Sequence, residues 1–212
     1  LALVLTPPAA RAEPPAGLVG AWSFDEGRGA VARDGSGHGN DARLHGAAWV
    51  PRDDGFALSF DGQTHYVDCG AGPSLDLRDA VTLEAWVKPT GSPTADAVII
   101  GKHYESYALT LYGANGVWFY ISSGGNNIKS TLDLHAWNHV VATFDGAAVN
   151  LYVNRARVAS GTSRCAEIAP GARFLMGVTE QHPDANDPTR TAAPHFRGEL
   201  DDVRVYNRAL TQ

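Results

Sequence analysis

Two carboxylates lie near strand-like segments at opposite ends of the chain, Asp25 just after residues 18–24 and Asp201 within residues 198–206. Between them, residues 34–40 (DGSGHGN) form a Gly-rich loop in which the glycines allow backbone carbonyls to converge. Calcium binds six to eight oxygens from carboxylates, carbonyls and water. Asp25, this loop and Asp201 therefore predict a calcium site joining the two ends of the chain. The competing interpretation is that Asp25 and Asp34 only cap turns.

A second group of residues has the chemistry of a sugar-binding surface. In residues 116–121 (GVWFYI), Trp118 and Tyr120 alternate with Val117, Phe119 and Ile121, so the two sets face opposite sides of a strand. An outward aromatic pair stacks on sugar rings, whereas an inward pair packs against a neighbouring layer, and both interpretations stay open. Hydrogen-bonding side chains from predicted loops complete this candidate site: His103, Tyr104, Asn126, Asn127, His182 and Asp184.

The connection over residues 178–197 is long for a loop between strands, which favours a functional loop, such as one that lines the edge of a ligand-binding site. Its Pro and polar content is equally typical of a disordered insertion. Catalytic motifs are missing from the sequence: it contains no nucleophile elbow, no His-Glu-x-x-His and no Glu-x-Asp-x-(x)-Glu strand motif, and the acids of residues 199–202 (ELDD) belong to the closing strand. Retaining glycoside hydrolysis needs two carboxyl groups about 5–5.5 Å apart. The sequence therefore predicts a non-catalytic protein, with a divergent glycoside hydrolase as the alternative.

The elements that must position these residues are predicted to be short strands. Twenty-three Gly and twelve Pro in 212 residues favour strands joined by turns over long helices. The period-two segments predict one all-β domain, a two-sheet antiparallel β-sandwich, with Trp22, Trp86 and Trp137 in its core and a short helical turn or irregular crossover at residues 73–77. The predicted strands are 18–24, 42–50, 56–61, 64–68, 80–88, 97–102, 106–112, 116–122, 127–131, 137–145, 148–153, 156–160, 173–177 and 198–206.

The N-terminus and the cysteines predict the compartment. Residues 1–12 (LALVLTPPAARA) have the apolar run and A-x-A ending of a signal peptide, and residues 13–17 form a disordered leader before a domain at 18–212. This predicts a secreted or cell-surface protein. Cys69 and Cys165 suit one disulfide in such a protein, or two separate buried thiols. A net charge of −6 without a basic cluster argues against nucleic-acid binding, and no later apolar run is long enough for a membrane span.

Several motifs in this order resemble the LamG-like jelly roll, a laminin-G and pentraxin relative in the concanavalin A-like lectin and glucanase superfamily. They cover nearly all of the chain after residue 17. The matching segments are 21–29 (AWSFDEGRG), 34–40 (DGSGHGN), 58–62 (LSFDG), 66–67 (YV), 73–77 (PSLDL), 81–89 (VTLEAWVKP), 137–146 (WNHVVATFDG), 151–154 (LYVN) and 198–210 (GELDDVRVYNRAL).

The resemblance implies a concanavalin A-like jelly roll and a calcium ion held by Asp25, Asn40 and Asp201. It also implies a non-catalytic binding module for an oligo- or polysaccharide that forms part of a larger extracellular protein. The alternative implied by laminin-G relatives is an adhesion or protein-interaction domain. Typical members of the family lack both cysteines, so the resemblance leaves open whether they are bridged.

Overall fold

The computed structural model describes residues 14–53, 55–91, 96–102, 106–113, 115–121, 127–163, 171–179 and 194–211. In these residues two antiparallel eight-stranded sheets pack face to face, which confirms the predicted all-β sandwich. The predicted signal peptide at residues 1–12 and most of the connection 178–197 lie outside the described residues. No helix in the described part of the chain is long and apolar enough to cross a membrane.

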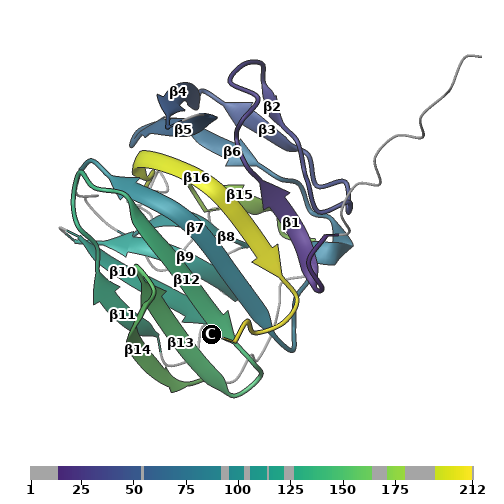
Figure 1. Cartoon of the computed structure of the whole chain (residues 1–212), viewed down its shortest axis with the longest axis vertical. Coiled ribbons are helices and arrows are strands. Elements are labelled where there is room, and N and C mark those ends of the chain that lie inside the picture. The colour runs from purple at the N-terminus through teal and green to yellow at the C-terminus, as the bar shows by residue number, and fades with distance from the viewer. Residues whose placement is uncertain are drawn as a thin grey trace, which may run out of the picture.

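The first sheet, called sheet A, contains both ends of the described domain. Its order is β14 (Ala156–Thr162), β13 (Ala148–Val153), β12 (Asn138–Phe144), β7 (Val81–Pro89), β16 (Arg197–Tyr206), β5 (Gly55–Asp61) and β4 (Ala48–Arg52). The remaining strand, β1 (Leu18–Trp22), pairs with the second half of β16. Figure 1 shows these first and last strands side by side, so the two ends meet as the sequence predicted.

The second sheet, sheet B, carries the candidate sugar-binding strand. Its order is β11 (Ile128–Thr131), β10 (Gly116–Ile121), β9 (Tyr107–Tyr112), β8 (Ala97–Lys102), β15 (Phe174–Met176), β6 (Tyr66–Asp68), β3 (Ala42–His45) and β2 (Val31–Ala32). A 3-10 helix, η1 (Pro73–Leu75), occupies the predicted helical turn. The prediction of one strand at 42–50 was wrong. Gly46 turns the chain with a φ of +78°, so β3 and β4 belong to different sheets.

The core forms where the apolar residues of each strand face the opposite sheet. In β7, Val81, Leu83, Ala85 and Val87 are buried toward the opposite sheet, while Glu84 and Trp86 between them are only partly buried. Trp22 of β1 crosses the core and stacks on Phe174 of β15, with ring centres 5.8 Å apart. Its indole N–H donates to the Asn40 carbonyl at 2.9 Å, which satisfies the one polar group of the buried ring. The prediction that Trp22 belongs to the core is therefore confirmed.

Candidate functional site

The outer face of sheet B presents an aromatic row. In β10 the side chains of Val117, Phe119 and Ile121 are buried, whereas Trp118 and Tyr120 are partly exposed on the other face. Strand alternation alone produces this division, because β10 is paired without interruption to β9 from Gly116 to Ile121. The aromatic pair of the predicted sugar-binding surface thus lies outward, while its role in binding stays a prediction.

A third ring, which the sequence reasoning missed, extends the row. Tyr112 ends β9 with 47% exposure, and its ring centre lies 4.4 Å from that of Trp118. The ring centres of Trp118 and Tyr120 lie 5.6 Å apart. The Lys129 ammonium from β11 lies 5.7 Å from the Trp118 ring centre. We call Tyr112, Trp118 and Tyr120 the sheet B aromatic row.

One end of this row is fixed by a hydrogen bond. The Tyr120 hydroxyl donates to the Asp96 carboxylate at 3.3 Å. Partial burial and the neighbouring Asp96 charge both raise the pKa of Tyr120, so the phenol stays protonated at any physiological pH. The Tyr120 ring is therefore held by this hydrogen bond. Tyr112, at the other end of the row, is exposed to solvent.

The polar rim predicted around this row is only partly described. Asn127 is exposed beside β11. The other predicted rim residues, His103, Tyr104, Asn126, His182 and Asp184, lie outside the described residues.

The predicted calcium ligand Asp201 lies on the outer face of sheet A and forms an ion pair. Its carboxylate Oδ2 accepts a hydrogen bond of 2.5 Å from the Arg52 guanidinium, and its Oδ1 accepts one from the Asp202 N–H at 2.7 Å. Asp202 has a φ of +48° and the β16–β7 register shifts between Asp201 and Arg204. Burial raises the pKa of Asp201 to about 6, because desolvation outweighs the opposing effect of Arg52.

The predicted ligand Asn40 belongs to a different cluster. Its side-chain amide donates to the Val19 carbonyl at 2.8 Å and to the Ser74 hydroxyl at 3.0 Å. Its backbone N–H donates to the Asp34 carboxylate, which also accepts hydrogen bonds from the backbone of Ala21 and from Ser36. Four donors therefore surround Asp34, and this loop ties β1 to η1.

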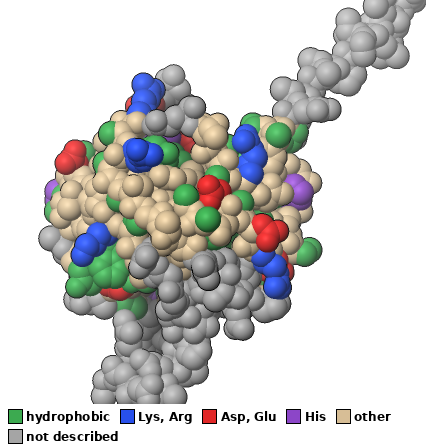
Figure 2. Space-filling view, turned by 90° about the horizontal axis from the view of Figure 1, so that it is seen from below, with side chains coloured by type: hydrophobic (Ala, Val, Ile, Leu, Met, Phe, Trp, Pro, Cys, Tyr) green, Lys and Arg blue, Asp and Glu red, His purple; other side chains and the backbone are tan. Residues whose placement is uncertain are grey.

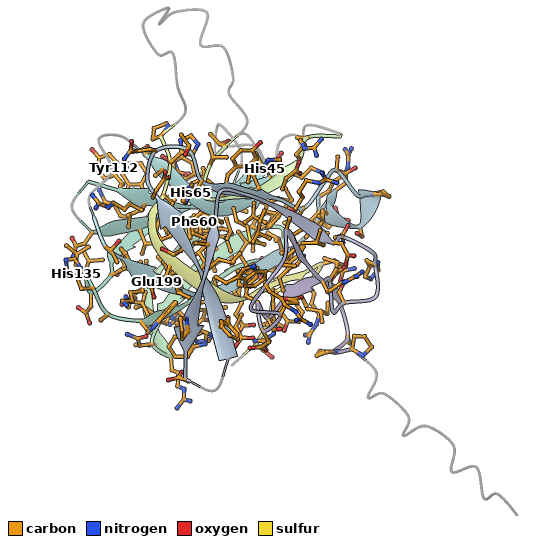
Figure 3. All side chains as sticks on the ribbon, turned by 90° about the horizontal axis from the view of Figure 1, so that it is seen from above. His45, Phe60, His65, Tyr112, His135 and Glu199 are labelled. Atoms are coloured by element: carbon orange, nitrogen blue, oxygen red, sulfur yellow. The ribbon has the colours of Figure 1, made fainter. Side chains whose placement is uncertain are left out.

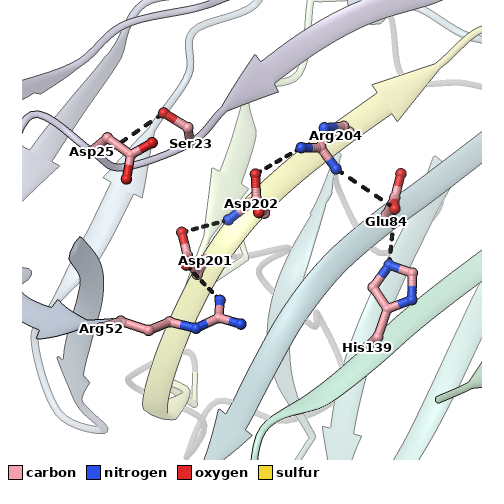
Figure 4. A network of polar contacts seen from close by, with 8 residues as sticks. All are labelled: Ser23, Asp25, Arg52, Glu84, His139, Asp201, Asp202 and Arg204. Atoms are coloured by element: carbon pink, nitrogen blue, oxygen red, sulfur yellow. Dashed lines mark hydrogen bonds and ion pairs between the residues drawn. The ribbon is translucent and has the colours of Figure 1, made fainter. Parts of the chain in front are cut away.

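Asp25, unlike Asn40, reaches the same end of the sheet as Asp201. β1 pairs Trp22 with Val203, so the chain after Trp22 continues toward Asp201, as Figure 4 shows. The exposed Asp25 carboxylate lies so close to Gly55 that a Cβ atom there would clash with it. Asn40 binds Val19, which is farther along β1 in the opposite direction.

Two of the three predicted calcium ligands make direct contacts with neighbouring protein groups in this arrangement. Asn40 is turned to another cluster, and Asp201 already holds a guanidinium. Among the residues that the structure describes, no group of three or more His, Cys, Asp or Glu side chains is placed to hold a metal. Calcium binding itself stays a prediction.

The prediction that Trp86 and Trp137 belong to the core was wrong. Both are only partly buried and lie on the outer face of sheet A, where they enclose the Arg52 guanidinium. The Arg52 Cζ atom lies 4.9 Å from the Trp86 ring centre and 4.1 Å from that of Trp137. The alternation Val81, Leu83, Ala85, Val87 was the available signal, because it already fills the inner face of β7 and sends Trp86 outward.

A polar network continues from this cluster along sheet A (Figure 4). His139 Nε2 and Glu84 Oε1 lie 2.9 Å apart, and Arg204 approaches the same oxygen at 3.7 Å. Burial alone would raise the pKa of Glu84, but the hydrogen bond with His139 and the Arg204 charge outweigh it and lower the pKa. Glu84 is thus a stable anion, with a structural partner on each side.

Cys69 directly follows β6 and is buried, and burial raises the pKa of its thiol well above the ordinary range. Cys165 lies outside the described residues, so a bridge between the two cysteines stays a prediction.

Similar proteins are found both by sequence and by structure. Mouse pappalysin-1 is 28% identical over 184 residues, which cover 74% of this chain and 10% of that protein. A Trypanosoma rangeli sialidase mutant displaying trans-sialidase activity superposes with a TM-score of 0.70 at 21% identity, covering 95% of this chain and 32% of the sialidase. The chain thus spans about a tenth of the first relative and a third of the second.

A single-domain structure matches over almost its whole length. It is domain 4 of AbnA, an extracellular arabinanase of Geobacillus stearothermophilus, in complex with arabinotriose. The TM-score is 0.67 at 22% identity, with 92% of this chain and 94% of that domain covered. At these identities the structural matches establish the fold alone.

The sequence also matches the Laminin_G_3 family over residues 61–212, which includes both the aromatic row and the closing strand β16. Since this is well over half of the chain and the sandwich has the corresponding architecture, the protein belongs to Laminin_G_3 in the concanavalin A-like lectin/glucanases superfamily.

Proposed function

We propose that this chain is a non-catalytic carbohydrate-binding module that binds an oligo- or polysaccharide through the sheet B aromatic row. The observation that carries the proposal is the set of three neighbouring rings, Tyr112, Trp118 and Tyr120, on one outer face. Aromatic faces pack on the apolar faces of sugar rings, and nearby polar groups orient them. Lys129 supplies such a polar group beside Trp118.

The likeness to an arabinanase domain in complex with arabinotriose supports this proposal, because that domain matches over nearly its whole length. It also supports a role as one part of a larger extracellular protein. Figure 2 views the sandwich from below Figure 1, where the described acidic and basic side chains are scattered and neither sign dominates.

The test is binding of neutral oligosaccharides to the wild-type protein, measured by isothermal titration with arabinohexaose, xylohexaose and cellohexaose. We expect Trp118→Ala to weaken binding by tenfold or more, because the indole supplies the largest contact area of the row. Val31→Ala, at an exposed position on β2 at the opposite edge of sheet B, is the control and should bind as wild type does.

Circular dichroism must show that Trp118→Ala stays folded. Unchanged affinity in a folded Trp118→Ala protein would reject the row as the site. Failure of the wild type to bind any oligosaccharide, with retention of an extracellular protein ligand instead, would favour the adhesion-domain alternative.

A further inference from the structure

A second aromatic cluster lies on the opposite outer face of the sandwich. Trp86 of β7 pairs across the sheet with His139 of β12, and their ring centres lie 5.0 Å apart. Trp137 precedes β12 and shares the Arg52 guanidinium with Trp86. Arg52 therefore packs against both indoles through cation–π contacts. We call Trp86, Trp137 and His139 the sheet A cluster.

Hydrogen-bonding pairs border this cluster. The Lys88 ammonium lies 3.2 Å from both carboxylate oxygens of Glu199 and 5.9 Å from the Trp137 ring centre. On the other side of the cluster, His139 of β12 pairs with Glu84 of β7. The side chains of Lys88 and Glu199 remain 28% and 22% exposed, so their remaining donors and acceptors are open to solvent.

The charges on this face cancel locally. Arg52 is paired with Asp201, Lys88 with Glu199, and Glu84 lies between His139 and Arg204. The pairing of these described charges leaves little net charge beside the cluster to attract an anion or a cation. This face suits a neutral polyol, because each hydroxyl of such a ligand both donates and accepts and can bridge a Lys–Glu pair beside an aromatic ring.

We infer that the outer face of sheet A is a second carbohydrate site, which takes neutral oligosaccharides on Trp137 and the Lys88–Glu199 pair. It rests on the proposed function only for the class of ligand, since the residues are all different. Tyr112 of the first site and Glu199 of the second lie in different sheets with the core between them (Figure 3). One chain would then hold two glycan segments at once, which raises its apparent affinity for a polysaccharide.

The experiment is isothermal titration of arabinohexaose, xylohexaose and cellohexaose into the wild type, Trp118→Ala, Trp137→Ala and the double variant. We expect two ligands per chain for the wild type, one for each single variant and none for the double variant. Lys88→Met combined with Glu199→Gln removes the polar pair but leaves every ring in place. It should weaken the sheet A site about tenfold or more and leave the sheet B site unchanged.

The possible outcomes separate the two proposals. One ligand per wild-type chain, lost completely in Trp118→Ala, would overturn the second site and leave the proposed function intact. One ligand lost only in Trp137→Ala would support the sheet A site and overturn the sheet B aromatic row. No binding of any of the three oligosaccharides would overturn both. If Trp137→Ala does not fold, the Lys88→Met, Glu199→Gln variant decides.

Discussion

The balance between burial and ion pairing at Asp201 can be measured through the pH dependence of stability. The folded-state pKa of about 6 lies above the ordinary value of 3.8, so between these values the folded protein binds more protons than the unfolded chain. The contribution of Asp201 to the free energy of unfolding is therefore largest below pH 3.8 and falls as the pH rises through 6. At about 1.4 kcal/mol per pH unit, the full loss is about 3 kcal/mol.

The perturbation is Asp201→Asn, which keeps the shape of the carboxyl group but cannot ionise. Urea unfolding of both proteins at pH 4.5 and pH 7.5 gives the difference in free energy at each pH, and effects of all other titrating groups cancel between the two proteins. We expect the wild type to lose about 1–3 kcal/mol relative to Asp201→Asn between pH 4.5 and pH 7.5.

A companion variant, Arg52→Met, removes the partner of Asp201 and leaves its carboxylate buried alone. The loss of stability in Arg52→Met should be larger at pH 7.5 than at pH 4.5, because only the ionised carboxylate needs the guanidinium. If the wild type instead gains stability relative to Asp201→Asn as the pH rises, then the Arg52 pair dominates and our reasoning on the sign is wrong.

Three further predictions concern burial, sulfur and calcium. Lys102 is fully buried against Asp76, so Asp76→Asn should cost about 3–5 kcal/mol in urea unfolding, and a loss below about 1 kcal/mol would contradict this. If Cys69 and Cys165 are bridged, thiol titration of the unfolded, unreduced protein should find no thiol; two thiols per chain would establish the unbridged state. A calcium ion bound at Asp201 should raise the free energy of unfolding by about 2.7 kcal/mol at a hundredfold excess over Kd and so raise the thermal midpoint relative to chelator; equal melts would refute it.

The sequence by itself determined which side chains each strand sends to each face. In β10 and β7 the period of two depends only on local backbone geometry, so Trp118 was predicted to lie on the opposite face from Val117, Phe119 and Ile121, whereas the packing of the two sheets decided which face is outward. The same local rule, applied strictly to β7, would also have placed Trp86 outside the core. The sandwich class was predicted for the same reason, since a repeated local pattern specifies half-buried strands, whereas the meeting of the first and last strands was predicted from their carboxylates, Asp25 and Asp201.

Only the tertiary structure decided which of these side chains meet. Arg52 reaches Asp201 and the two indoles because β4 and β7 lie on either side of β16 and β5, a neighbourhood fixed by long-range pairing that no local pattern encodes. Asn40 illustrates this, because its amide binds β1 at Val19 and the helical turn at Ser74, which lie 21 and 34 residues away in the chain. Local periodicity thus determines the direction of a side chain, whereas sheet order determines its partners.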